Sequence, residues 1–64
     1  MKDPELKIMS DSNNYATIKV LYHSEINDVN IYISSDEIFL DDPDKVRLLA
    51  AKLNEMATEM EKNK

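Results

Sequence analysis

Apolar and polar residues alternate along the first two-thirds of the chain, and the period then changes. The runs at 15–24 (YATIKVLYHS) and 29–34 (VNIYIS) alternate residue by residue and are rich in β-branched and aromatic side chains, which is typical of strands. A shorter segment at 5–9 has Leu6 and Ile8 two positions apart, and a short apolar run at 37–40 (EIFL) follows the next turn-forming residues. The pattern therefore predicts four strands, at about 5–9, 15–24, 29–34 and 37–40.

The turns of this sheet must be made without glycine, because the chain has none. Asn27-Asp28 is predicted to form a two-residue hairpin loop, and Ser35-Asp36 a second one. With these two turns, most apolar strand side chains share one face, and a one-residue slip at either turn would mix the faces. The residues of that face are Ile18, Val20, Tyr22, Ile26, Val29, Ile31, Ile33, Ile38 and Leu40.

After Asp42 the apolar residues recur at spacings of three and four, which indicates an amphipathic helix over about 43–61. Asp42 suits the N-cap, Pro43 the first helical position and Asp44 the first turn. The apolar stripe consists of Val46, Leu49, Leu53, Met56 and Met60.

The predicted fold is an α+β domain spanning 1–64, in which an antiparallel β-meander of about four strands is followed by one C-terminal amphipathic helix packed on the sheet. Leu49 and Leu53 are expected to pack against Ile31 and Ile33. The stripe also fits about two and a half heptads, so pairing with a partner helix is an alternative, but docking on the chain's own sheet is preferred. A chain of 64 residues has a small core, and self-association is a common way to stabilise one.

Acidic residues dominate the charge of the chain, which has a net charge of −5 and a pI of about 4.6. No basic residue lies between Lys19 and Lys45. Direct binding to nucleic acid or to an anionic membrane depends on clustered Lys and Arg and is not expected. The expected partner is therefore a protein, and a basic one. The carboxylates of the base-free interval are Glu25, Asp28, Asp36, Glu37, Asp41, Asp42 and Asp44.

The absence of particular residue types excludes several kinds of chemistry. Without cysteine the chain has no disulfide and no thiolate metal site, and its one histidine cannot build a His-rich site. Without glycine it has no phosphate-binding or dinucleotide loop and no calcium loop of the EF-hand kind, so no cofactor or metal is expected. No apolar run has the length of a membrane span or a signal peptide. We expect a cytoplasmic protein, and its size and acidity are typical of bacteriophage and mobile-element products.

Two interpretations of the acidic residues remain open. In one, they only punctuate turns and cap the helix, which explains Asp42 and Asp44 well. In the other, the remaining ones form a negative surface for a basic partner. The candidate partner-binding residues are Asp36, Glu37, Asp41, Asp28 and Glu25.

The second face of the sheet is a further candidate site. In the predicted register Leu21, His23, Tyr32 and Phe39 converge there, with Tyr32 directly facing Phe39. One helix cannot cover both faces of a sheet, so this cluster is expected to be exposed. An exposed aromatic cluster is typical of a dimer or partner interface. The alternative is that the N-terminal segment folds over it. His23 with Glu25 on the same face is the only candidate acid–base pair, and a lone histidine on a strand is seldom catalytic.

The preferred functional hypothesis is a non-enzymatic, acidic protein-binding module that forms a homodimer. A specific version is an inhibitor that presents carboxylates to the basic groove of a nucleic-acid-handling protein. The alternative is a small structural or accessory subunit of a larger complex, whose acidity serves only solubility. An enzyme that uses His23 and Glu25 is disfavoured, and no catalytic residue is assigned.

Overall fold

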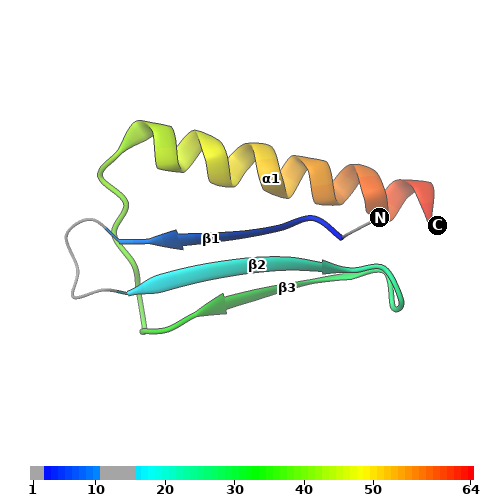
Figure 1. The fold of residues 1–64 in the computed structure, drawn as a ribbon, viewed down its shortest axis with the longest axis horizontal. Coiled ribbons are helices and arrows are strands. Elements are labelled where there is room, and N and C mark those ends of the chain that lie inside the picture. Colours follow the sequence, from blue (N-terminus) through cyan, green and yellow to red (C-terminus); the bar gives the residue numbers. More distant parts are fainter. Residues whose placement is uncertain (1–2, 11–15) are drawn as a thin grey trace.

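The computed structural model describes residues 3–10 and 16–64, which form a three-stranded antiparallel sheet followed by one helix. The strands are β1 (Glu5–Met9), β2 (Thr17–His23) and β3 (Asp28–Ile33), and they lie in the order β1-β2-β3. The helix α1 (Pro43–Lys62) runs along the length of the sheet as a second layer (Figure 1). The predicted α+β fold with a C-terminal helix is confirmed, with three strands rather than four.

The predicted fourth strand at 37–40 is wrong. This segment belongs to an irregular connection that leads from the end of β3 to the start of α1 (Figure 1). Ser35 explains part of the difference, because its hydroxyl donates to the carbonyl of Glu37 at 2.8 Å and accepts from the amide of Glu37 at 3.4 Å. Such local side-chain bonds occupy backbone groups that a strand would use for its ladder.

The predicted two-residue turn at Asn27-Asp28 is also wrong, because the β2–β3 turn spans four residues, 24–27. Asn27 has a positive φ of 56° and closes this turn, so that Asp28 already pairs with His23 in the ladder. A two-residue loop of the common I′ type would need positive φ at both central residues. The register is consequently shifted by four residues, and Tyr22 pairs with Val29 instead of Ile33.

The part of the predicted face that lies in β2 and β3 is kept, because a shift by four residues is even and side chains alternate with a period of two. Ile26 in the turn and Ile38 and Leu40 in the connection do not belong to it. Ile18, Val20 and Tyr22 lie on the same face as their partners in β3. β1 adds Leu6 and Ile8, which pair with Val20 and Ile18. The sheet therefore has one apolar face, toward α1, and one mixed face, away from it.

The core lies between α1 and this apolar face. Met56 is fully buried, and it packs with Val20 and Tyr22. The half-buried residues around this cluster are Leu6, Val29, Leu49, Leu53 and Met60.

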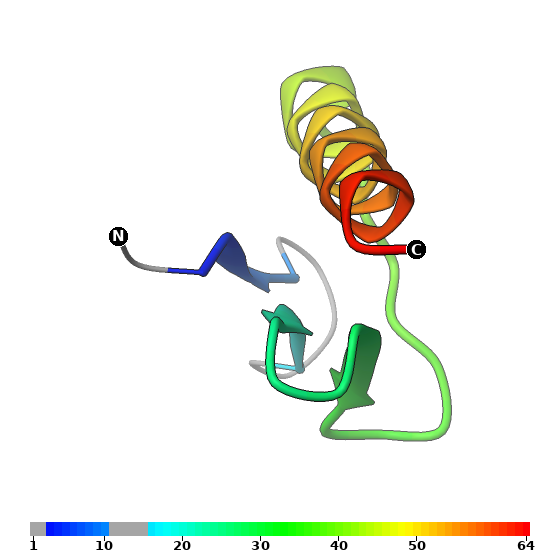
Figure 2. The same ribbon diagram turned by 90° about the vertical axis from the view of Figure 1, so that its right-hand side faces the viewer.

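The helix is not centred on the sheet. It packs closest to β1, and the end-on view shows β3 farthest from it (Figure 2). Ile31 and Ile33 are therefore 55% and 41% exposed, although Val20, which pairs directly with Ile31, is only 1% exposed. Leu49 and Leu53 pack against the core cluster and are only half-buried, and Ile31 and Ile33 are exposed, so the predicted burial of the leucines against these isoleucines is not found.

Candidate functional site

The candidate acidic residues do not form one cluster. Glu25 and Asp28 lie at the β2–β3 turn, and Asp36, Glu37 and Asp41 lie in the connection at the opposite end of the sheet (Figure 1). The molecule is 38 Å long, so the two groups are separated by most of its length. We call the first group the turn-end pair and the second the linker-end carboxylates.

The linker-end carboxylates belong to exposed residues, and Asp42 and Asp44 follow them in the chain. Five acidic residues thus lie within nine positions of one another. Two basic residues come next, Lys45 and Arg47. The Lys45 ammonium donates to the carbonyl of Met9 at 3.1 Å. Arg47 contacts the carboxylate of Asp44 at 3.5 Å, and since both side chains are well exposed this ion pair contributes little stability.

Asp42 is the N-cap of α1. Its extended backbone (φ −101°, ψ 115°) precedes Pro43, and its carboxylate accepts a hydrogen bond of 2.9 Å from the amide of Asp44. Its backbone carbonyl accepts from the amides of Lys45 and Val46 and so begins the helical ladder. The Asp42 side chain therefore has a structural task that Asp36 and Asp41 do not share.

The turn end contains a third carboxylate that the sequence pattern does not reveal. Asp3 accepts hydrogen bonds from the amide of Ser24 at 3.1 Å and from its hydroxyl at 3.0 Å. Asp3 and Ser24 are 21 residues apart, and only the pairing of β1 with β2 brings them together. The same end is tied to the helix by Asn27, which bonds both Tyr22 and the carbonyl of Met60.

The predicted second-face cluster is only partly assembled. Leu21, His23 and Tyr32 lie on the sheet face away from α1, but Tyr32 pairs with Lys19 and His23 with Asp28. The predicted pairing of Tyr32 with Phe39 is wrong, because Phe39 is not in the sheet.

Phe39 lies in the connection instead. Its carbonyl accepts from the hydroxyl of Ser10 at 2.7 Å, and its side chain is exposed. Ser10 follows the end of β1, at the end of the sheet opposite His23, so Phe39 and His23 do not share a site (Figure 1).

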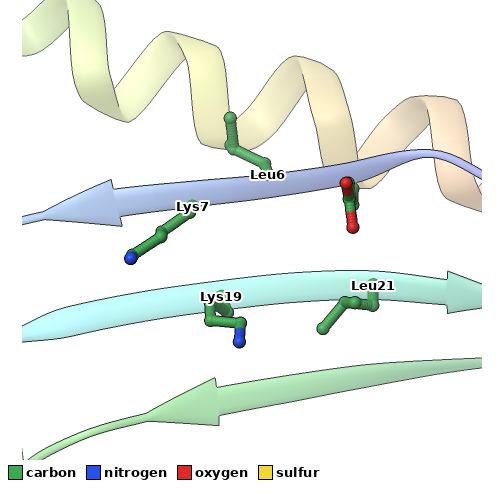
Figure 3. Close-up of a pocket in the computed structure, with 5 residues that line it drawn as sticks. Leu6, Lys7, Lys19 and Leu21 are labelled. Atoms are coloured by element: carbon green, nitrogen blue, oxygen red, sulfur yellow. The ribbon is translucent and has the colours of Figure 1, made fainter.

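The second face carries two lysines at its centre. Lys7 of β1 and Lys19 of β2 occupy directly paired positions, and with Glu5, Leu6 and Leu21 they line a hollow of about 360 Å³ (Figure 3). Like charges at paired positions destabilise a sheet slightly. Residues 5–9 of the N-terminal segment form β1 at the edge of the sheet and do not fold over this face. The face is therefore mixed in charge and only partly apolar.

The carboxylate that strand pairing places opposite His23 belongs to Asp28, not to Glu25 of the predicted acid–base pair. Glu25 lies in the turn and not on the strand beside it. In the part of the chain that the structure describes, no three side chains of the metal-binding kinds are grouped to hold an ion. Neither α1 nor any other described helical stretch combines the length and apolar character needed to span a bilayer.

Comparisons with protein-family models, with curated proteins and with solved structures gave no match to this chain.

Proposed function

We propose that the protein is a non-enzymatic protein-binding module whose linker-end carboxylates dock on a basic surface of a partner protein. The observation that carries this proposal is the gathering of five acidic residues in positions 36–44 at one end of an elongated molecule. Of these, Asp42 is occupied by capping the helix. Asp36 and Asp41 are exposed and are available to a partner.

A basic groove of a nucleic-acid-handling protein is the kind of partner that such a surface fits. Complementary charge accelerates encounter and selects the partner more than it raises final affinity. The net charge of −5 adds a long-range attraction to basic surfaces and a repulsion from nucleic acid. Self-association as a homodimer and a cytoplasmic location are parts of the same proposal, the latter on composition alone.

The experiment uses the partner captured from the native host by the tagged full chain and then purified. Its affinity is measured for the wild type and for two charge-reversed variants at low and at moderate salt. Asp36→Lys with Asp41→Lys reverses the linker end. Glu25→Lys with Asp28→Lys makes the same change in net charge at the turn end and is the matched control.

We expect the linker-end variant to bind more weakly, mainly through slower association, and to lose much of the salt dependence of binding. The turn-end variant should keep most of its affinity. Equal losses in both variants would mean that only net charge matters. Unchanged binding in both would favour the alternative, an accessory subunit whose acidity serves solubility.

A further inference from the structure

The outer edge of β3 has backbone groups without a strand beside them. Among the described residues β3 pairs only with β2. The amide of Ser34 donates to the carbonyl of Thr17 at 2.9 Å, which fixes the phase of the antiparallel ladder. Because hydrogen-bonded and non-hydrogen-bonded pairs alternate, Val29, Ile31 and Ile33 direct their N–H and C=O groups away from β2.

The same edge carries exposed apolar side chains. Ile31 and Ile33 lie on the face toward α1, but the helix packs nearer to β1 and leaves them 55% and 41% exposed (Figure 2). No charged residue and no proline occurs in positions 29–35. An exposed apolar edge strand without such protection is a template for pairing with another strand.

The opposite edge of the sheet differs in each of these respects. Bonds from Tyr22 to Pro4 and from Ser10 to Ala16 fix the phase of β1, so that Glu5, Lys7 and Met9 direct their backbone groups outward. Two of these three residues are charged, and the strand follows a proline. The outward carbonyl of Met9 also accepts from the Lys45 ammonium at 3.1 Å. The edge of β1 is therefore protected, whereas that of β3 is not.

We propose that a second copy of this chain pairs with β3 through its own β3, antiparallel and around a two-fold axis at Ile31. Ile31 would face Ile31 of the second copy, and Val29 would face Ile33 in both directions. This register pairs every outward N–H and C=O of these three residues. It gives one continuous six-stranded sheet with both helices on the same face and the isoleucines at the seam between them.

Two observations favour a second copy over a strand from another protein. The outward groups are self-complementary about Ile31, so a two-fold axis satisfies all of them. Two chains of net charge −5 repel, and this edge is a stretch without charge at which they can meet.

This inference adds the self-association surface to the proposed function, and its test needs no partner protein. Sedimentation equilibrium of the purified full chain from 1 to 100 µM should show a monomer–dimer equilibrium. Ile31→Lys places two like charges at the two-fold axis and should weaken the dimer by more than about tenfold. Ile26→Lys is the matched control, since Ile26 is 66% exposed in the β2–β3 turn, and it should dimerise as the wild type does.

Hydrogen exchange of the wild type tests the same contact without a substitution. The amides of Val29, Ile31 and Ile33 should exchange at least about tenfold more slowly at high than at low protein concentration. A wild-type monomer at 100 µM, or these three amides exchanging at the same rate at both concentrations, would overturn the proposal. So would an Ile31→Lys dimer as stable as that of the wild type. Protection that arises only when a captured partner is added would assign the edge to a foreign strand instead. The linker-end charge variant should dimerise normally, so failure of the proposed function would leave this result unchanged.

Discussion

Asn27 joins the β2–β3 turn to the end of α1. Its replacement should separate the stability that comes from its side-chain hydrogen bonds from the stability that comes from its tolerance of a left-handed backbone. Its backbone has a φ of 56°, the only positive φ among the described residues. Its side-chain oxygen accepts from the hydroxyl of the buried Tyr22 at 2.6 Å, and its amide donates to the carbonyl of Met60 at 3.2 Å. Asn63 donates to the same Tyr22 hydroxyl at 3.0 Å, so the network fastens the last turn of the helix to the hairpin.

Asn27→Gly keeps the left-handed backbone and removes both side-chain hydrogen bonds. Since a typical intramolecular hydrogen bond contributes about 0.5–1.5 kcal/mol, the loss should be about 1–3 kcal/mol. Asn27→Ala removes the same bonds and also forces a residue with a Cβ into the left-handed region, which costs roughly a further 1–2 kcal/mol. The alanine variant should therefore be the less stable of the two.

The control is Glu25→Gly, which adds the same flexibility to the same turn at an exposed residue. Urea unfolding followed by circular dichroism measures all variants, at one fixed protein concentration, because self-association would make stability depend on concentration. If Asn27→Gly were no less stable than Glu25→Gly, the network would add nothing to folding. If the glycine and alanine variants were equally stable, the positive φ at position 27 would not disfavour a residue with a Cβ.

Two other substitutions test the core and the helix start by thermal unfolding. Met56→Ala empties the fully buried centre of the core and should cost about 2–5 kcal/mol, whereas Leu48→Ala on the exposed side of α1 should cost much less. Similar losses from both would mean that α1 is rotated from its described orientation. Asp42→Ala should cost about 0.5–2 kcal/mol through loss of the N-cap bond. Asp41→Ala, its exposed neighbour, should change stability by less than about 0.5 kcal/mol, and a loss as large as that from Asp42→Ala would contradict the assignment of the cap.

The faces of the sheet could be predicted from the sequence, although the register could not. Alternation specifies which side chains share a face, and any even shift in register preserves this. The partner of Tyr22 is Val29 instead of the predicted Ile33, which is a shift of four residues. The turn was missed because its length is decided by contacts that are distant in sequence. Asn27 is held by Met60, 33 residues later, and no local pattern reveals that contact.

The failure of the predicted strand at 37–40 has a similar origin. Its apolar residues fit a strand locally, but Ser35 and Ser10 bind backbone groups of Glu37 and Phe39. Helix α1 was predictable because its period, its cap at Asp42 and the proline after it agree with one another.

The sequence shows which acidic residues the candidate site contains, but it does not show how they are arranged in space. Closeness in sequence suggested one negative belt from Glu25 to Asp44. However, β3 begins at Asp28 and ends at Ile33, before Asp36, so Asp28 and Asp36 lie at opposite ends of the sheet (Figure 1). Asp3 lies at the same end as Glu25 and Asp28 only because β1 pairs with β2, which brings its carboxylate to the amide of Ser24. A stretch of acidic residues without Lys or Arg therefore predicts one continuous negative surface only where no strand lies within the stretch.

The exposure of Ile31 and Ile33 follows from the proportions of the two layers. A helix is about 10 Å wide with its side chains, and strands lie about 4.8 Å apart, so one helix covers about two strands. The chain has three strands for one helix, and α1 lies nearest to β1. The third strand must then expose its apolar face unless something else lies beside it. The connection cannot shield the whole strand, because it runs past one end of the sheet (Figure 1). Pairing of two β3 edges would place Ile31 and Ile33 beside the same residues of the second copy and between the two helices. The two-fold symmetry would thus bury the apolar side chains that one helix is too narrow to cover.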